Sequence, residues 1–427
     1  MLQLCISGIS SNSGKTTLTT ALLYHFKKSV RPFKIGPDYI DPQFHTKICQ
    51  TPSINLDSFM MDGKQVQWLY ENYSDKKVSI VEGVMGFYDG EDRGCSAYSV
   101  TKLLDIPTIL ILDGSGSYIT ISAVLKGLLE YKNDNTIKAV VLNHIASQGH
   151  FELIRDILNR DHKEIVVLGW IHNNLHNLHD THLGLDLEEL DKVEMISKDV
   201  LQHIDLTLLE NVAKKKLHTK LEIYPFDTIE KQNKHLAIVT DENFSFLYHD
   251  NLVFLKEIFQ TVTIVKSTKD EIIPNDADSV YICGGYVESE KAYARVKDST
   301  NFKNSLIEHS KTKKIYAECA GLLYLGNRVD EKKMSGIVDV DFTLCSRFTR
   351  LGYYYNEANI KGHSFHYTKP LDDSCGFTKE SRAFDVLSKE LNGVGEMGSW
   401  ANKTQKVFGT YLHTMFRNNI SLVKDKF

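Results

Sequence analysis

The sequence predicts an α/β protein with two domains, each built around a parallel sheet. Short apolar runs rich in Val and Ile alternate with stretches of helical length along most of the chain, and this alternation is typical of buried parallel strands joined by helices. A chain of 427 residues is also too long for one compact core,. The alternation is interrupted once, between residues 186 and 232, which places the expected boundary between the domains there.

Composition and charge exclude several classes of protein. The chain is 42% hydrophobic and 25% charged, as ordinary globular proteins are. Its net charge of −5 argues against a nucleic-acid partner,, and no apolar run approaches the length of about 18 residues that a membrane span needs. The first residues lack the basic segment of a secretion signal. Seven cysteines, an odd number without a C-x-x-C pair, favour a reduced cytoplasmic enzyme,.

The first domain is expected at residues 1–185. Residues 2–9 read as a strand and residues 15–28 as the helix after it. The further buried strands expected here are 78–84, 107–114, 137–145 and 164–171.

A charged stretch with helical spacing occupies much of residues 186–232, and we interpret it as a helical connector with a solvated face,. A second α/β domain is expected at 233–427. Its predicted strands are 235–241, 261–267, 279–285 and 314–320.

The first expected strand is followed by "GISSNSGKTT" (8–17), a glycine-rich loop that opens a helix. This loop is one residue longer than the usual G-x-x-x-x-G-K-[ST] pattern. Backbone N–H groups around such a turn bind phosphates, and the helix directs its positive end toward them. We predict that the loop binds a nucleotide through Gly8, Ser13, Gly14, Lys15, Thr16 and Thr17.

Carboxylates follow two other segments of the first domain. Glu82 comes directly after an apolar run, and Asp89 lies seven residues further on. Asp38 and Asp41 flank Tyr39 in "IGPDYIDPQFH" (35–45), where Pro and Gly predict an irregular loop,. An acidic side chain at a strand end is the usual partner of a phosphate loop. The alternatives are a satisfied strand-end carboxylate and aspartates that only shape a turn.

A cysteine occupies a predicted strand-to-helix turn in "KKIYAECAGLLYLG" (313–326). Ala317 and Gly321 are small enough to allow a tight turn, which would project the Cys319 thiol outward as in a nucleophile elbow. The alternative is a buried core cysteine, since free Cys is among the most buried residue types.

Ten segments together resemble the cobyrinate a,c-diamide synthase family, and they occur in that family's order over nearly the whole chain except the connector. They are "GPDYIDP" (36–42), "NLDSFMM" (55–61), "VEGVMGFYDG" (81–90), "HLGL" (182–185), "YHDNL" (248–252), "CGGYVE" (283–288), "AECAGLLYL" (317–325), "LGYYY" (351–355), "GHSFHY" (362–367) and "GTYLHTMF" (409–416).

This resemblance implies an enzyme that amidates the c- and a-carboxylates of a corrin precursor of vitamin B12, using ATP, Mg²⁺ and glutamine. It implies an N-terminal synthetase domain similar to dethiobiotin synthetase, whose phosphate loop is also the longer one. It further implies a C-terminal domain similar to class I glutamine amidotransferases. The expected partner is a tetrapyrrole small molecule, and a homodimer is possible.

The resemblance also implies roles for single residues. Cys319 matches the glutaminase nucleophile and His413 its general base, while the backbones of Gly285 and Ala320 are candidates for the oxyanion hole. No acidic residue follows His413 within two positions, so the third member of that site stays open. In the synthetase, the implied metal ligands are Thr16, Asp41 and Glu82. The implied substrate-loop residues are Asp38, Tyr39 and Asp41. Asp89 is the implied second acid, and Asn143 is the implied contact of adenine.

Four positions depart from the family pattern. Cys283 stands where a third glycine is usual, Val287 stands where a proline is usual after the glycines, and Ala320 stands where a second glycine follows the cysteine. Thr181 replaces an arginine before "HLGL". The first three bear on the geometry of glutamine hydrolysis, and the fourth removes a possible carboxylate or phosphate clamp.

Rival functions remain open at this level. Hydrogenobyrinate or nickel-sirohydrochlorin could replace cobyrinate, and cobyric acid synthase fits the acidic motifs less well. A P-loop switch ATPase with an inactive amidotransferase-like domain is a rival of another class. Glutaminase activity would exclude that last interpretation.

Overall fold

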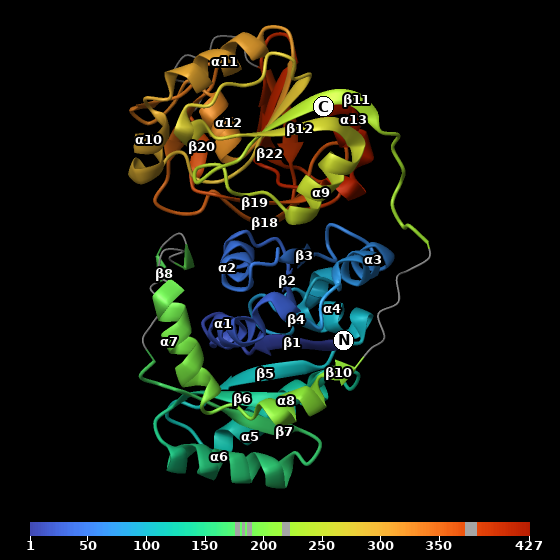
Figure 1. Ribbon diagram of the computed structural model, residues 1–427, viewed down its shortest axis with the longest axis vertical. Coiled ribbons are helices and arrows are strands. Elements are labelled where there is room, and N and C mark those ends of the chain that lie inside the picture. The colour runs from blue at the N-terminus through green and yellow to red at the C-terminus, as the bar shows by residue number, and fades with distance from the viewer. Residues whose placement is uncertain (176–179, 182–183, 186–189, 216–222, 372–381) are drawn as a thin grey trace. The chain divides into compact units, whose positions relative to one another are not determined.

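The computed structural model describes residues 1–175, 180–181, 184–185, 190–215, 223–371 and 382–427. These residues form two compact units, Met1–Pro225 and Phe226–Phe427 (Figure 1). Each unit has a sheet and a hydrophobic core of its own, so the expected α/β class with two sheets is confirmed.

The first unit is built on a parallel sheet in the order β3-β2-β4-β1-β5-β6-β7, with β10 added antiparallel to β1. The strands are β1 (Leu2–Gly8), β2 (Val30–Ile35), β3 (Ile54–Leu56), β4 (Val78–Glu82), β5 (Thr108–Asp113), β6 (Ile137–Ile145), β7 (Val166–His172) and β10 (Lys214–Lys215), and a separate pair is formed by β8 (Asp180–Thr181) and β9 (Gly184–Leu185). The helices are α1 (Lys15–Phe26), α2 (Ile40–Cys49), α3 (Gly63–Tyr73), α4 (Ala97–Leu104), α5 (Ile119–Tyr131), α6 (Gln148–Asp161), α7 (Leu190–Leu201) and α8 (Leu206–Val212), with 3-10 turns at Lys27–Ser29 and Glu91–Arg93.

Alternate residues of β1 share a hydrophobic core with helices of the first unit. Leu4 and Ile6 belong to the same buried cluster as Leu18 and Leu22 of α1. Ile196 of α7 joins that cluster as well. Burial of such side chains is worth roughly 1.5–3 kcal/mol each, so α1 is fixed against the sheet directly behind the phosphate loop.

The stretch 35–45, which the sequence predicted to be an irregular loop, is only partly irregular. That prediction was wrong from Ile40 onward, where α2 begins. Pro42 lies in the first turn of α2, where a proline is tolerated because the N–H that it lacks would have no partner within the helix. Asp38 accepts the backbone N–H groups of Ile40 and Asp41 at 2.8 and 3.2 Å, so two N–H groups at the start of this helix have a partner.

The second unit contains a mixed sheet in the order β12-β11-β13-β14-β23-β22-β21, in which the first five strands are parallel and the last two antiparallel. Its strands are β11 (Gln232–Val239), β12 (Phe259–Val265), β13 (Ser279–Ile282), β14 (Lys314–Glu318), β21 (Arg382–Leu387), β22 (Glu396–Ala401) and β23 (Val407–Thr410). The helices are α9 (His249–Ile258), α10 (Glu290–Val296), α11 (Thr300–Ser310), α12 (Ala320–Leu325) and α13 (Ile420–Lys426), with 3-10 turns at Ser267–Lys269 and Phe416–Asn418.

Two smaller sheets complete the second unit. The strands β15 (Arg328–Val329), β16 (Lys332–Lys333), β17 (Asp341–Leu344) and β20 (Thr368–Pro370) form the first of them, and β18 (Arg350–Tyr355) and β19 (Lys361–His366) form an antiparallel hairpin. This hairpin brings the "GHSFHY" segment against the chain after β23, because His363 and His413 exchange two backbone hydrogen bonds of 2.8 Å.

The stretch 186–232 contains α7 and α8 among its described residues. Val193 and Ile196 of α7 are buried in the core of the first unit, and the division between the units falls after Pro225. Residues 182–183 of "HLGL" and Cys375 lie outside the described residues.

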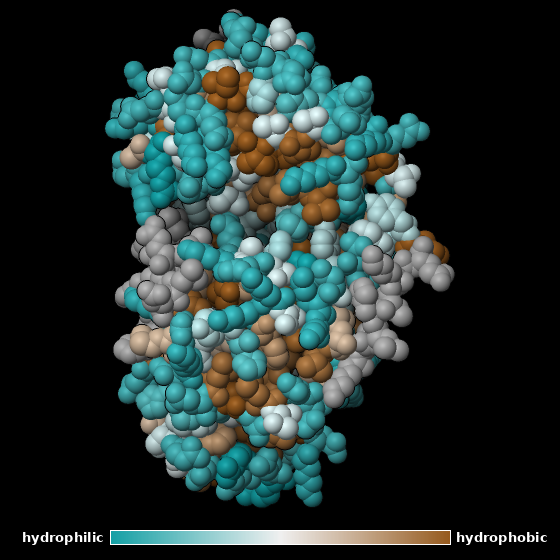
Figure 2. Space-filling view, viewed as in Figure 1, coloured by the Kyte–Doolittle hydropathy of each residue, from teal (hydrophilic) through white to brown (hydrophobic). Residues whose placement is uncertain are grey.

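The surface carries mostly polar side chains, interrupted by apolar areas in both units on the face that Figure 2 shows. Within the described ranges, no helix has both the length and the apolar character needed to span a bilayer.

A test of local folding is offered by α3, which begins with a capping box. Asp62 accepts the N–H of Gln65, whose side chain accepts the N–H of Asp62, each at 2.9 Å. We expect Asp62→Ala to lower the free energy of unfolding by about 1 kcal/mol, since the backbone N–H of Gln65 loses its side-chain acceptor,. Urea unfolding followed by circular dichroism measures this. The surface variant Lys64→Ala serves as the control, and equal stability of the two variants would contradict the expectation.

Candidate active sites

The phosphate loop lies between β1 and α1, where the sequence placed it. Gly14 caps α1 with φ of 99°, a left-handed conformation that glycine adopts without strain. Lys15 is buried and donates from Nζ to the backbone oxygen of Ser10 at 2.7 Å. A Cβ on Gly8 would come within 1.9 Å of Ser13 Oγ. The closed loop therefore depends on glycine at both of its ends.

Glu82 is the carboxylate that the loop contacts. It ends β4, next to β1 in the sheet, and is fully buried. Thr16 donates to its Oε1 at 2.9 Å, and His45 Nε2 lies 2.7 Å from its Oε2. A buried carboxylate needs such partners, because an unpaired charge is costly to bury. The predicted pair of Thr16 and Glu82 is thus brought together, and His45 is a contact that the sequence reasoning missed.

Lys34 of β2 is a second residue that it missed. Its ammonium group is buried and donates to Asp41 Oδ2 at 2.5 Å, with Glu82 Oε1 at 3.3 Å and Asp38 Oδ2 at 3.5 Å. Lysine is rarely buried without a partner. A lysine inside the apolar run "VRPFKI" was the signal that could have revealed it.

The charges of this cluster shift one another's proton affinities. Burial alone would raise the pKa of Glu82, but Lys34 and His45 lower it to about 2. Burial raises the pKa of Asp41 to about 7 against the opposing charge of Lys34, with Asp38 adding to the rise. Burial and the charge of Lys34 lower the pKa of Lys15. Two cations and three carboxylates therefore share one buried region of the first unit.

The loop before α2 is held by the side chain of Asn55, which belongs to β3. Asn55 Nδ2 donates to the carbonyl oxygens of Gly36 and Asp38 at 3.0 and 2.7 Å. Tyr39, the residue before α2, is buried.

Asp89 accepts the N–H of Gly86 at 2.7 Å, so its carboxylate closes the turn of "VMGFYD". Asp89 also adds to the negative charge around Lys15.

Asn143, on β6, contacts the phosphate loop. Its Nδ2 donates to the backbone oxygen of Ser13 at 2.9 Å, and a Cβ on Gly14 would approach that nitrogen to 2.4 Å. The side-chain amide for which we predicted an adenine contact therefore holds the loop in this structure. Thr17 follows Thr16 in α1.

Cys319 lies at a strand-to-helix elbow in the second unit. It connects β14 to α12 with φ of 46° and ψ of −106°, a strained conformation for a residue with a Cβ. Its N–H donates to Thr410 O at 2.8 Å. A Cβ on Gly321 would come within 2.7 Å of the Ile282 backbone oxygen. The predicted tight turn is present, and small residues are needed for it.

His413 is brought to the same edge of the sheet by the segment after β23. The pairing of β14 with β23 sets Glu318 opposite Thr410, three residues before His413. A Cβ on Gly284 would lie 2.2 Å from His413 Cε1, so the "CGGY" turn lies directly against the ring. Cys319 and His413 are 94 positions apart in the sequence, so only the fold can bring them to the same edge of the sheet.

The environment of Cys319 raises the pKa of its thiol. Burial raises its pKa, and the charges of Glu288 and Glu318 raise it further. Hydrogen bonds from the backbones of Ala320 and Gly285 act in the opposite direction. Ala320 and Gly285 are the two residues whose backbones were expected to form the oxyanion hole, and that role stays a prediction. A thiol that starts protonated needs a base to become a nucleophile.

Glu318, directly before the cysteine, is the third residue that the sequence reasoning missed. Its Oε2 lies 3.1 Å from His413 Nδ1. An acidic partner was expected only among the residues after His413. A carboxylate at the end of a buried strand, beside the nucleophile, was the available signal.

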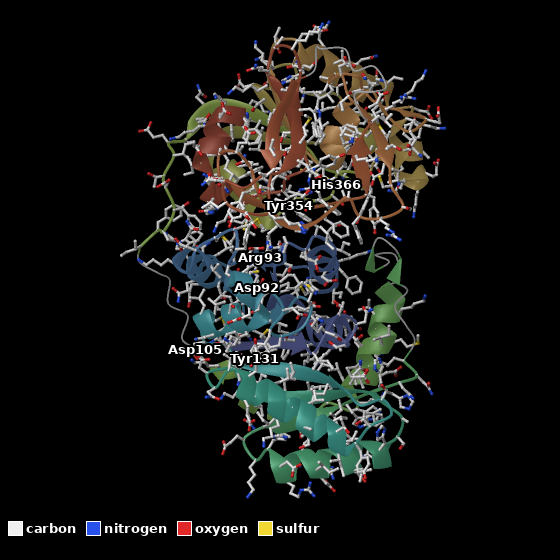
Figure 3. All side chains as sticks on the ribbon, turned by 180° about the vertical axis from the view of Figure 1, so that it is seen from behind. Asp92, Arg93, Asp105, Tyr131, Tyr354 and His366 are labelled. Carbon is white, nitrogen blue, oxygen red and sulfur yellow. The ribbon has the colours of Figure 1, made fainter. Side chains whose placement is uncertain are left out.

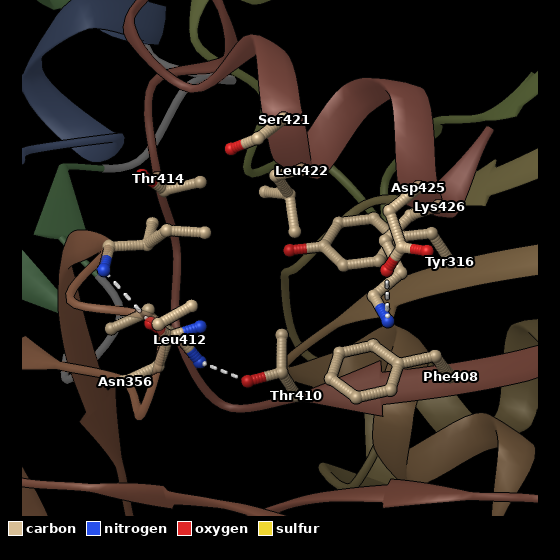
Figure 4. Close-up of a pocket in the computed structure, with 12 residues that line it drawn as sticks. Tyr316, Asn356, Phe408, Thr410, Leu412, Thr414, Ser421, Leu422, Asp425 and Lys426 are labelled. Atoms are coloured by element: carbon tan, nitrogen blue, oxygen red, sulfur yellow. Dashed lines mark hydrogen bonds and ion pairs between the residues drawn. The ribbon is translucent and has the colours of Figure 1, made fainter.

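The surroundings of this second site are aromatic. His366 of β19 stacks on Tyr411 with ring centres 3.6 Å apart; burial and the charge of Arg350 lower the pKa of His366 to about 3. Figure 3 labels His366 and, on β18, Tyr354. A cavity of about 270 Å³ is lined in part by Tyr316 and by Leu412 and Thr414, which flank His413 in the sequence (Figure 4).

The first site has the donor set that Mg²⁺ favours. Thr16 and Glu82 offer hard oxygen ligands side by side, and this ion is usually bound by one or two side chains together with water and phosphate oxygens. Asp41, the other predicted ligand, pairs with Lys34 here. No group of three or more His, Cys, Asp or Glu suited to a metal occurs among the residues the structure describes.

Comparison with known proteins agrees with both halves of this description. Residues 4–178 match the model of the CobQ/CobB/MinD/ParA nucleotide binding domain, and residues 235–420 match the CobB/CobQ-like glutamine amidotransferase domain. A cobyrinate a,c-diamide synthase of Streptococcus sanguinis is 34% identical, over 99% of this chain and 98% of that protein. The chain belongs to the cobyrinate a,c-diamide synthase family.

Other members of the cobyrinate a,c-diamide synthase family give the same result. The protein of Listeria monocytogenes is 32% identical, over 100% of this chain and 99% of its own length. The protein of Methanococcus vannielii is 31% identical, over 97% of this chain and 96% of its own length. A solved glutamine amidotransferase from Thermotoga maritima has a TM-score of 0.30 at 12% identity, covering 46% of this chain and 86% of that chain, a score too low to support an argument. The family resemblance inferred from the motifs is confirmed by the sequence relatives.

The ion cluster around Lys34 can be tested by its removal. We expect Lys34→Met to lower the free energy of unfolding by about 3–5 kcal/mol, because buried carboxylates lose their cation. Adding Asp41→Asn should recover part of the loss, since one of these charges disappears. Urea unfolding of the three proteins measures both steps. A double variant no more stable than Lys34→Met would contradict the assignment of the charge pair.

The close approach of Gly284 to His413 is open to a second test. Gly284→Ala should lower the kcat for glutamate release from glutamine on the order of 100-fold, since the added methyl displaces the imidazole base. Gly127→Ala is the control, because a Cβ at that helical position meets nothing within 4 Å. Unchanged glutaminase activity in Gly284→Ala would show that His413 is not held in the position described.

Proposed function

We propose that the protein amidates the a- and c-carboxylates of cobyrinate or hydrogenobyrinate in vitamin B12 biosynthesis, with ATP as energy source and glutamine as nitrogen donor. The observation that carries the proposal is the presence of two complementary sites in one chain. The first unit has a phosphate loop bonded to a buried strand-end carboxylate. The second has an elbow cysteine at the same sheet edge as a histidine that contacts a carboxylate.

In the first site, a carboxylate of the tetrapyrrole would attack the γ-phosphate of ATP and form an acyl phosphate and ADP. Lys15 and the N-terminus of α1 would hold the phosphates, and Lys34 supplies a second fixed cation beside Asp41. Electrostatic stabilisation of this kind carries most of the catalysis of phosphoryl transfer. Mg²⁺ held at Thr16 and Glu82 would neutralise charge on the phosphate oxygens, and Asp38, Tyr39 and Asp89 line the loops expected to meet the substrate.

In the second site, Cys319 would attack the side-chain carbonyl of glutamine while His413 takes the thiol proton. The N–H groups of Ala320 and Gly285 would stabilise the oxyanion of the tetrahedral intermediate. His413 returns the proton to the leaving nitrogen, which gives ammonia and a thioester, and water then releases glutamate. Ammonia displaces phosphate from the acyl phosphate to form the amide.

The finer features of the proposal come from the same residues and from the family. A reduced, cytoplasmic setting agrees with the free cysteines of the described residues,. A tetrapyrrole substrate without a nucleic-acid partner agrees with the acidic net charge and with the names of the relatives. A homodimer and the requirement for Mg²⁺ also belong to the proposal. Nickel-sirohydrochlorin is the second candidate substrate.

The test is the product mass after incubation with Mg-ATP, glutamine and one of three rings: cobyrinate, hydrogenobyrinate or nickel-sirohydrochlorin. We expect one ring to show the decrease of two exchanges of OH for NH₂. Cys319→Ser should abolish this product with glutamine and restore it with added ammonia, because only the glutaminase step needs the thiolate. ATP hydrolysis without a mass change on any ring would instead support the switch ATPase.

A further inference from the structure

Glu318 is surrounded by three polar groups of the second unit. It is buried at the end of β14. Its Oε2 lies 3.1 Å from His413 Nδ1 and 3.0 Å from the hydroxyl of Tyr281, and its Oε1 lies 3.3 Å from the hydroxyl of Tyr316. Tyr281 belongs to β13 and Tyr316 to β14, so two neighbouring strands fix both oxygens of the carboxylate.

The chemistry of these groups determines where the protons lie. An ionised carboxylate only accepts hydrogen bonds, so both tyrosine hydroxyls donate to Glu318. The contact with His413 then requires a proton on Nδ1. A neutral imidazole carries one N–H, which leaves the lone pair on Nε2. In this tautomer His413 can accept a proton at Nε2.

We propose that Glu318 is the positioning residue of the glutaminase site, which holds His413 in the tautomer with the proton on Nδ1 so that Nε2 can take the proton of the Cys319 thiol. The inference rests on the proposed function and supplies the third member of that site. The role corresponds to that of the buried aspartate in a Ser-His-Asp triad. Here the carboxylate comes from the residue before the nucleophile.

The local backbone explains how adjacent residues can serve the two ends of one proton transfer. Residues 316 and 318 of β14 share a face, because side chains alternate along a strand. Consecutive side chains of a regular strand point to opposite faces, but Cys319 leaves β14 with φ of 46°, so the alternation ends at Glu318. Pairing of Glu318 with Thr410 brings the His413 segment alongside.

A second role of Glu318 follows from the same geometry. Burial and the charges of Glu288 and Glu318 raise the pKa of the Cys319 thiol, while the contact of Glu318 with His413 stabilises the imidazolium that forms when the thiol loses its proton. Charge on Glu318 therefore favours the ion pair of thiolate and imidazolium over a thiolate alone.

The tautomer can be observed directly in the wild-type protein. Selective ¹⁵N labelling of histidine, with His413 assigned by difference from His413→Gln, should show a protonated Nδ1 and an unprotonated Nε2 at neutral pH. In Glu318→Gln the signals should shift toward the other tautomer, because the amide can donate to Nδ1. A wild-type His413 with its proton on Nε2 would overturn the proposal, whether or not any variant folds.

Kinetics of glutamine hydrolysis test the consequence. We expect Glu318→Gln to lower kcat on the order of 100-fold with KM for glutamine within about threefold of wild type, since the base and not substrate binding is affected. Tyr281→Phe and Tyr316→Phe should each lower kcat only a few-fold. Tyr324→Phe is the matched control, because Tyr324 is also buried but lies on α12.

Added ammonia separates this inference from the proposed function. Glu318→Gln should form the amide from ammonia at the wild-type rate, because that reaction needs no glutaminase. A wild-type kcat with glutamine in Glu318→Gln would overturn the role of Glu318. Failure of the wild type to amidate any ring with ammonia would overturn the proposed function, and the histidine tautomer would still decide the positioning role.

Discussion

The buried Glu82 carboxylate is the constraint on which the first site depends. It ends a central strand of the sheet and accepts a hydrogen bond from the phosphate loop through Thr16. Lys34 approaches it from β2 and His45 from α2. A carboxylate in this position cannot be left with an unpaired charge, so segments far apart in the sequence must close around it. The placement of the phosphate loop is one result of that requirement.

The second unit uses a comparable arrangement. Glu318 also ends a parallel strand, is also buried and also contacts a histidine from another segment. In both units the carboxyl ends of parallel strands form the reactive edge, as is general for open α/β sheets. The two units differ in the residue directly after the strand. Gly83 comes after Glu82, whereas Glu318 is succeeded by a strained cysteine that starts a helix.

Both edges contain strained backbone or close packing. The positive φ of Cys319 and the left-handed Gly14 both occur where a strand passes into a helix. Gly284 and Gly321 leave no room for a side chain beside His413 and β13. Such conformations persist only where the surrounding packing enforces them, and the hydrophobic clusters behind β1 and β14 provide that packing.

The chain alone was sufficient to predict the fold class, the strands β1, β4–β7 and β11–β14, and the phosphate loop, because these rest on local periodicity or on motifs in a recognisable order,. The pairing of Cys319 with His413 stays a prediction from the motifs. The chain alone did not reveal α2 beyond Ile40, since Gly and Pro suggested a loop. Nor did it reveal the contacts of Lys34 and Glu318. Those contacts join strands that are adjacent only in the sheet, and a buried charge shows its partners only when the strands are paired.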